Sequence, residues 1–198
     1  MKKFFVMVVM ASLLVACGKK NTETPNADTN DVDVEMAELP TDVKEAIDHN
    51  ITASMDDADV SYNSLMDTNN DGKNEIIVSV KSSLTDECSY DVYSFDTDYN
   101  CYMNRGGGGN STSSIKDDYL VYEQGPLMLG EGVKSATIYV HLSAMDYVTK
   151  NVMENGSIEY KVYPEGYMEQ DAMEALVKKL DAIEGVACES IKEWKKIK

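Results

Sequence analysis

Basic residues are scarce in this sequence. Its 198 residues include 18 lysines and arginines against 35 aspartates and glutamates, which gives a formal net charge of −17 at pH 7. Binding to nucleic-acid phosphates depends on a basic surface that releases counterions, so we expect no nucleic-acid partner. Hydrophobic residues make up 43% of the chain, which is enough to bury a core and excludes disorder of the whole chain.

Catalytic and metal-binding patterns built on cysteine and histidine are also missing. No C-x-x-C spacing occurs, so the sequence supports neither a zinc site of that kind nor a thioredoxin-like motif. The chain has two histidines. His49 lies off the apolar stripe of an expected helix, and His141 alternates with Tyr139 in an expected strand. We therefore name no catalytic residue and favour a non-enzymatic protein over an enzyme, although the sequence leaves the question open.

No apolar run is long enough to cross a membrane as a helix. The longest covers residues 4–16, contains Ser12 and follows Lys2 and Lys3. A membrane-spanning helix needs about 20 apolar residues. A positively charged start followed by a short apolar run is typical of a secretory signal peptide. We therefore predict that the chain is exported.

The end of this apolar run contains a cysteine in a characteristic context. Leu14-Val15-Ala16-Cys17 resembles the lipobox of bacterial surface lipoproteins. The resemblance implies that residues 1–16 are removed as a lipoprotein signal peptide and that Cys17 carries acyl chains such as palmitate. Two or more chains anchor a protein stably, so we expect a lipid anchor on the extracytoplasmic face of the cell membrane. The alternative is an ordinary signal peptide that contains a cysteine.

Composition divides the remaining chain into a tether and one domain. Residues 17–40 are rich in Asn, Thr, Asp and Glu. Such a segment cannot offset its chain entropy by burial, so it is expected to be a lipidated, flexible tether. Residues 41–198 are expected to form a single domain. Its first element is predicted to be a helix with Thr41 as N-cap and an apolar stripe of Val43, Ile47, Ile51 and Met55.

The rest of the domain is predicted to contain strands followed by a helix. Strands are expected at residues 60–66, 76–80, 90–95, 99–103, 119–122, 136–142, 147–153 and 158–163. The composition of residues 105–114 favours a loop. From about residue 168 the apolar period becomes helical, and residues 189–196 are expected to form a short final helix. Strands bracketed by an N-terminal and a C-terminal helix predict an α+β fold with a mainly antiparallel sheet.

One segment carries oxygen side chains at regular spacing. In residues 67–75 (DTNNDGKNE), the first, third, fifth and ninth positions are Asp67, Asn69, Asp71 and Glu75. Side chains spaced by two around a tight turn can converge on one ion, and calcium takes six to eight oxygen ligands. The glycine at the sixth position permits the bend, and Lys73 would contribute its backbone carbonyl. The segment therefore predicts a calcium site, with an ordinary polar turn as the alternative.

This D-x-N-x-DG-x-x-E segment resembles the calcium loops of EF-hand, dockerin and integrin-type β-propeller repeats. Val78 stands where an EF-hand places a bidentate glutamate, and the flanking residues are typical of strands. The strand–loop–strand version is therefore the closer match, with Glu75 completing the site. Three carboxylates without a bidentate ligand suggest structural calcium bound at about 10⁻⁴–10⁻³ M. The following E-I-I-V strand also resembles a segment of Gram-positive surface lipoproteins, and this resemblance implies no enzymatic role.

Three cysteines remain once Cys17 is assigned to the anchor. Disulfides are permitted outside the membrane. A bridge between Cys88 and Cys101 would close a short loop and is worth about 3 kcal/mol in the chain-entropy model. It requires a bend or bulge in the expected hairpin. Pairing of either cysteine with Cys188 stays open, and one thiol is left over in each case.

Together these features indicate a membrane-anchored, acidic lipoprotein of the cell envelope with a structural calcium loop. It would act as a non-enzymatic binding or structural module with a protein or glycan partner. Two alternatives stay open. One is an extracellular hydrolase that uses paired carboxylates, and the other is a calcium-dependent adhesion module that uses the tyrosine-rich hairpin around residues 90–102.

Overall fold

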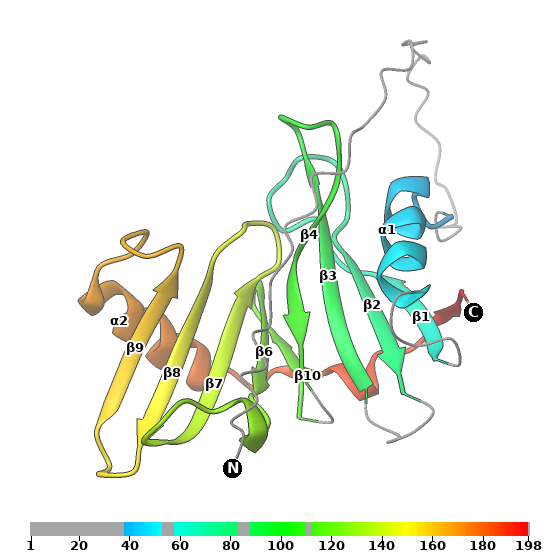
Figure 1. Cartoon of the computed structure of the whole chain (residues 1–198). Helices are drawn as coiled ribbons and strands as arrows, with labels where there is room; N and C mark the ends of the chain where they lie inside the picture. The colour runs from blue at the N-terminus through cyan, green and yellow to red at the C-terminus, as the bar shows by residue number, and fades with distance from the viewer. Residues whose placement is uncertain (1–37, 53–57, 83–87, 110–111, 198) are drawn as a thin grey trace. The chain divides into compact units, whose positions relative to one another are not determined.

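The computed structural model describes residues 38–52, 58–82, 88–109 and 112–197 (Figure 1). Within these residues the chain forms eleven strands in two antiparallel sheets, together with two α-helices and two short 3₁₀ helices. The expected anchor at Cys17 and nearly all of the expected tether lie outside the described residues.

The first sheet has the strand order β11-β1-β2-β3-β4. All four neighbouring pairs are antiparallel, and β1, β2, β3 and β4 follow one another as a meander. Helix α1, Thr41–Thr52, precedes this sheet in the sequence. The strands are β1 (Asp59–Ser64), β2 (Ile76–Lys81), β3 (Cys88–Asp96), β4 (Cys101–Gly108) and β11 (Lys195–Lys196).

The second sheet has the order β10-β5-β6-β7-β8-β9. Its long strands are again joined as a meander, and the 3₁₀ helix η1 (Pro126–Met128) lies between β6 and β7. Helix α2, Gln170–Asp181, follows β9. The strands are β5 (Ser114–Lys116), β6 (Tyr119–Glu123), β7 (Val133–His141), β8 (Tyr147–Met153), β9 (Ile158–Tyr163) and β10 (Val186–Ala187).

The prediction of an α+β fold is therefore wrong. The described residues form a mainly β structure in which antiparallel pairing divides into two sheets, and the helices are a minor part of it. Composition and periodicity mark individual strands, but they do not show where pairing stops and a second sheet begins. Here pairing stops between β4 and β5, which are consecutive in sequence but belong to different sheets.

Alternating side chains of the strands supply two different cores. In the first sheet, Val60, Ile76 and Val78 pack against Val43 and Ile47 of α1. In the second sheet, apolar side chains pack against α2, whose buried residues are Met173, Val177 and Leu180. Each helix thus covers one face of one sheet. The side chains of Ile51 and Met55, expected on the stripe of α1, are not among those described.

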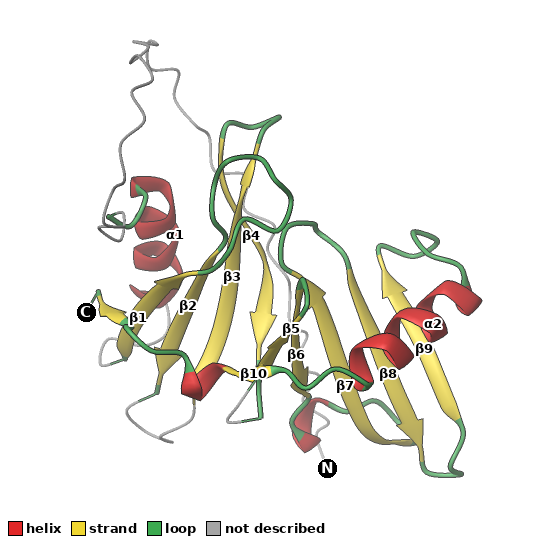
Figure 2. Cartoon of the chain, turned by 180° about the vertical axis from the view of Figure 1, so that it is seen from behind, coloured by secondary structure: helices red, strands yellow, loops and turns green. Residues whose placement is uncertain are grey.

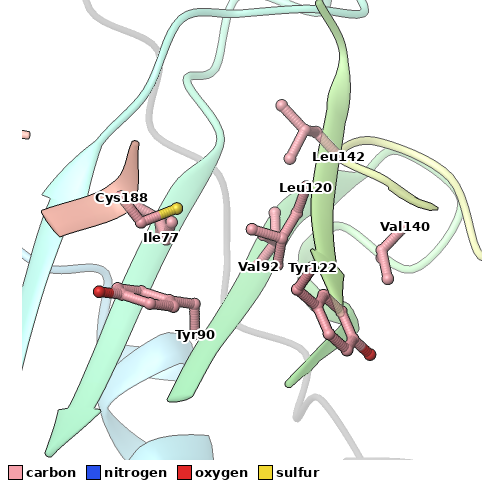
Figure 3. Packing of buried hydrophobic residues seen from close by; sticks show 8 residues of the cluster. All are labelled: Ile77, Tyr90, Val92, Leu120, Tyr122, Val140, Leu142 and Cys188. Carbon is pink, nitrogen blue, oxygen red and sulfur yellow. The ribbon is translucent and has the colours of Figure 1, made fainter. Parts of the chain in front are cut away.

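The other faces of the two sheets meet in a central cluster. Ile77 and Val92 of the first sheet pack there with Leu120 and Val140 of the second (Figure 3). This explains why Ile76-Ile77-Val78 is a continuous apolar run rather than an alternating one, since strand β2 is buried on both faces. The cluster also contains Tyr90, Tyr122, Leu142 and Cys188.

The prediction of a loop over residues 105–114 is wrong for residues 105–108, which end strand β4, and for Ser114, which begins β5. A β-carbon on Gly107 would collide with the Asp91 carboxylate and the Tyr90 carbonyl oxygen, and one on Gly108 would lie 2.8 Å from the Tyr122 hydroxyl oxygen. The absence of side chains lets the last residues of β4 pair with β3 while approaching β6 of the second sheet. Glycine here indicates close packing rather than freedom of the chain.

The C-terminal helix expected at residues 189–196 is also absent from the described structure. That segment contains the 3₁₀ helix η2, Cys188–Ser190, and the short strand β11. Lys195 pairs with Tyr62 and Lys196 pairs with Ser61. The edge of β1 offers backbone hydrogen bonds, as from the Ile197 N–H to the Val60 carbonyl oxygen at 2.8 Å, and this tertiary contact outweighs local helix propensity. Figure 2 shows the segment passing from α2 along β10 toward β1.

Candidate metal-binding loop

The predicted calcium segment connects two paired strands. Ser64 at the end of β1 is opposite Ile76 at the start of β2. The Leu65 N–H continues the ladder by donating to the Glu75 carbonyl oxygen at 2.7 Å. Residues 66–74 therefore form a closed loop at the end of a hairpin, which is the strand–loop–strand setting that the sequence predicts.

Three of the predicted ligands turn toward the backbone inside this loop. The two carboxylate oxygens of Asp67 accept hydrogen bonds from the N–H groups of Asp71 and Gly72, at 3.2 and 2.9 Å. Asp71 accepts from the Lys73 N–H at 2.7 Å. Asn69 bonds to Asp71 twice, through its side-chain oxygen to the backbone and through its amide nitrogen to the carboxylate. The turn is tight, with φ of +83° at Gly72, a value that favours glycine.

Glu75, the last predicted ligand, is almost completely buried, with 1% of its surface exposed. Its carboxylate accepts a hydrogen bond from the Thr68 N–H at 2.8 Å. Burial raises the pKa of Glu75, and the negative charge of Asp67 raises it further. Thr68 adds a buried hydroxyl oxygen that makes no hydrogen bond within the described residues. The base of the loop thus contains a desolvated carboxylate and an unsatisfied hydroxyl group.

Tyr102 of β4 brings a further element to the loop. Its hydroxyl donates to the Asn74 carbonyl oxygen at 3.2 Å. Burial raises the pKa of Tyr102, and four carboxylates add to the shift: those of Asp71, Asp42, Glu75 and Asp67. The Tyr102 hydroxyl group therefore lies in the negative electrostatic field of the loop carboxylates and of Asp42 from α1.

Among the described residues, no ion pair is recorded between Lys73 and these carboxylates. Its Nζ lies 5.3 Å from the centroid of the Phe95 ring. A cation over an aromatic face contributes roughly 0.5–1 kcal/mol at exposed sites. The Lys73 side chain therefore packs on the Phe95 ring, and the role of its backbone carbonyl as a calcium ligand stays a prediction.

The oxygen atoms of this loop are of the type that calcium binds, but they are not arranged around an ion. No three His, Cys, Asp or Glu side chains of the described residues gather closely enough to hold a metal ion. Calcium also uses amide and backbone carbonyl oxygens, and Asn69 and Lys73 can supply these. Ion binding would require Asp67 and Asp71 to exchange backbone N–H partners for the cation.

The structure separates the two cysteines expected to form a disulfide. Cys88 is the first residue of β3, opposite Lys81, whereas Cys101 starts β4 opposite Asp96, the last residue of β3. Eight residues of extended chain span about 26 Å, and a disulfide requires Cα atoms within about 7 Å. The predicted Cys88–Cys101 bridge is therefore wrong.

A second polar cluster surrounds His141 and was not identified from the sequence. The His141 Nε2 lies 3.3 Å from a carboxylate oxygen of Asp118, and its Nδ1 accepts the Ser143 N–H at 3.2 Å. Asp146 is buried nearby, and one of its carboxylate oxygens has no hydrogen-bond partner within the described residues. Burial raises the pKa of Asp146. The alternation of His141 with Tyr139 gave no sign of these contacts.

Carboxylates with raised pKa do not pair with one another in the described structure. Burial raises the pKa of Glu75, of Asp146 and of Asp91, the last to about 6. The recorded neighbours differ in each case: Asp67 for Glu75, Asn104 for Asp91, and both His141 and Asp118 for Asp146. The neighbours of Glu75 and Asp146 thus each include a second carboxylate, Asp67 and Asp118 respectively.

Comparisons with known proteins give no further guidance. No family model, curated protein or solved structure matches the chain. Among the helices of the described residues, none combines the length and apolar character that crossing a membrane requires.

Proposed function

We propose that this chain is a lipoprotein anchored through Cys17 to the extracytoplasmic face of the cell membrane, and that its 67–75 loop binds calcium as a structural ion. It serves as a binding or structural module with a protein or glycan partner rather than as an enzyme. The Leu14–Cys17 motif supports the anchor. The buried carboxylate of Glu75, which lies within electrostatic range of Asp67, is the observation that carries the calcium site.

The charge arrangement explains what calcium would do. Three carboxylates share one short loop, and burial already disfavours the charged form of Glu75. A divalent cation would offset the repulsion among these carboxylates. By binding them together it would hold the loop between β1 and β2 in one conformation. We expect binding at about 10⁻⁴–10⁻³ M, the range of extracellular calcium modules. In this range the loop would be loaded outside the cell and empty at cytosolic calcium levels.

Calcium binding is tested on the full chain in detergent by calorimetric titration and thermal unfolding. We expect saturable calcium binding and a rise in Tm, because an ion that binds only the folded state stabilises it. The double variant Asp67→Asn plus Asp71→Asn should lose both effects. Glu159→Gln, which removes an exposed carboxylate on β9, is the matched control and should behave as the wild type. Absence of heat and of a Tm shift at about 10 mM calcium, tenfold above the weak end of the expected range, overturns the calcium site.

The anchor is tested separately by labelling cells with radioactive palmitate. The wild-type chain should carry the label and sediment with membranes, and Cys17→Ser should do neither. Labelling of Cys17→Ser, or membrane association without any label in the wild type, would contradict anchoring at Cys17. Since this test does not depend on calcium, the two halves of the proposal stand or fall independently.

A further inference from the structure

Two of the three cysteines beyond the anchor lie in the same core. Cys88 opens strand β3, and Cys188 opens the 3₁₀ helix η2 between β10 and β11. Both are free thiols in the structure. Cys188 is completely buried in the central cluster between the sheets, and Cys88 is half-buried and packs against that cluster. Figure 3 shows the Cys188 side chain next to Ile77, on the same side of the sheet as Tyr90.

Tyr90 connects the two cysteines. Cys88 and Tyr90 are two residues apart on one strand, so their side chains point to the same face. Burial raises the pKa of the Tyr90 hydroxyl, and Cys88 and Cys188 both add to the shift through their proximity. The two thiols therefore lie within electrostatic range of one hydroxyl group, although 99 residues separate them in the chain.

Cys101 lies elsewhere. It begins β4 at the far end of the β3–β4 hairpin, and its Sγ is 3.9 Å from the Sδ of Met103. It does not belong to the central cluster. Cys88 and Cys188 are thus the two cysteines that share the central cluster.

We propose that Cys88 and Cys188 form a disulfide in the exported protein. This inference rests on the proposed function in one respect, since export places the chain where disulfides persist. The chemistry is thiol–disulfide exchange with a disulfide-bonded oxidant outside the membrane. The two thiols lose two protons and two electrons as the S–S bond forms, and the oxidant's disulfide takes them up to become two thiols.

The burial of Cys188 determines when during folding the disulfide can form. Burial raises the pKa of the Cys188 thiol to about 12, so almost no thiolate is available in the folded chain, and exchange proceeds through the thiolate. The bridge therefore forms while the chain folds, before the central cluster closes. A folded, reduced chain should oxidise slowly, and the same chain should oxidise quickly when it refolds from denaturant.

The bridge would fix the C-terminal segment where it leaves one sheet for the other. Residues 186–196 run from β10 of the second sheet to β11 of the first, and η2 lies midway. In the described residues β10 and β11 each form only two residue pairs with their neighbours. A covalent link from η2 to β3 would hold these short strands in place.

The first test refolds the denatured full chain in a glutathione redox buffer, followed by alkylation and peptide mass mapping. We expect a peptide pair that contains Cys88 linked to Cys188, with Cys101 alkylated. Cys188→Ala should abolish the link, and Cys101→Ala, the matched control, should keep it. Reduction should lower Tm by about 5–15 °C in the wild type and in Cys101→Ala but not in Cys188→Ala. Alkylation of all three cysteines, or a bridge through Cys101, overturns the proposal.

The second test maps the same peptides from chain extracted from cell membranes without reductant. The linked Cys88–Cys188 pair is expected there as well. A chain that forms the bridge on refolding but arrives from the membrane fully reduced overturns the disulfide in the cell, while palmitate labelling still reports on the anchor. Failure of the disulfide and failure of the lipoprotein assignment are therefore separate results.

Discussion

The Tyr122 hydroxyl donates a hydrogen bond to the Gly107 carbonyl oxygen at 2.9 Å. The first residue lies on β6 of the second sheet and the second on β4 of the first. This bond joins two sheets that share no strand pairing. The adjacent Gly108 allows the β4 backbone to come this close, because a β-carbon there would lie 2.8 Å from the Tyr122 hydroxyl oxygen.

Gly107→Ala should destabilise the domain by about 3 kcal/mol. The added β-carbon would collide with the backbone of Tyr90 and with Asp91, and backbone atoms cannot move aside cheaply. Urea unfolding followed by tyrosine and tryptophan fluorescence measures the change. Gly125→Ala is the control, because a β-carbon there meets nothing within 4 Å, and it should change stability by less than about 0.5 kcal/mol. Equal effects of the two substitutions would contradict the tight packing of Gly107 against β3.

Tyr139→Phe should cost about 1.5–3 kcal/mol, the range for a hydrogen bond to a charged group. The Tyr139 hydroxyl is buried and donates to Asp181 at 2.7 Å, which ties β7 to the end of α2. Lys150 also donates to this carboxylate, at 2.6 Å. Tyr99→Phe removes an exposed hydroxyl and should be nearly neutral. Similar denaturation midpoints for the two variants would show that the Asp181 contact contributes little.

Asp91→Asn should stabilise the domain at neutral pH. Burial raises the Asp91 pKa to about 6, so the folded state binds a proton more tightly than the unfolded chain. A group of this kind contributes its full stability below the unfolded pKa of about 3.8 and loses it as pH rises through 6. The asparagine variant carries no such penalty. Its advantage, about 3 kcal/mol at pH 7, should nearly vanish at pH 4. An advantage that does not change with pH would exclude titration of Asp91 as its cause.

The positions of most strands could be predicted from local pattern. The expected strands at 147–153 and 158–163 coincide with β8 and β9, and Asn155-Gly156 forms the turn between them, with φ of +84° at Gly156. Turn residues between alternating runs are a strong local signal. Residues 67–75 likewise indicated a loop between two strands, and residues 66–74 do join β1 to β2.

Long-range partners could not be predicted in this way. Strand β11 forms because Lys195 pairs with the edge of β1, more than 130 residues earlier in the chain. No feature of residues 189–196 indicates that edge. The composition of the glycines of β4 favoured a loop. Their close packing depends on β6, which lies next to them only in the folded chain. At the loop, Tyr102 approaches from β4 and Asp42 from α1. Neither contact follows from the spacing within the motif.

Glu75→Gln separates the role of the Glu75 charge from that of its shape. Glutamine can still accept the Thr68 N–H, but it removes a buried negative charge whose pKa is raised by burial and by Asp67. Without calcium the variant should be at least as stable as the wild type at pH 7. Its advantage should shrink as pH falls, because protonation then neutralises Glu75 in the wild type as well.

With calcium the order of stability should reverse. The wild type gains Tm as the ion binds, and Glu75→Gln should bind at least tenfold more weakly because one of three carboxylate ligands is neutral. Thermal unfolding with calcium, with chelator and with magnesium measures both halves of this prediction. The variant could instead be more stable without calcium and still bind calcium with wild-type affinity. That result would show that Glu75 does not ligate the ion.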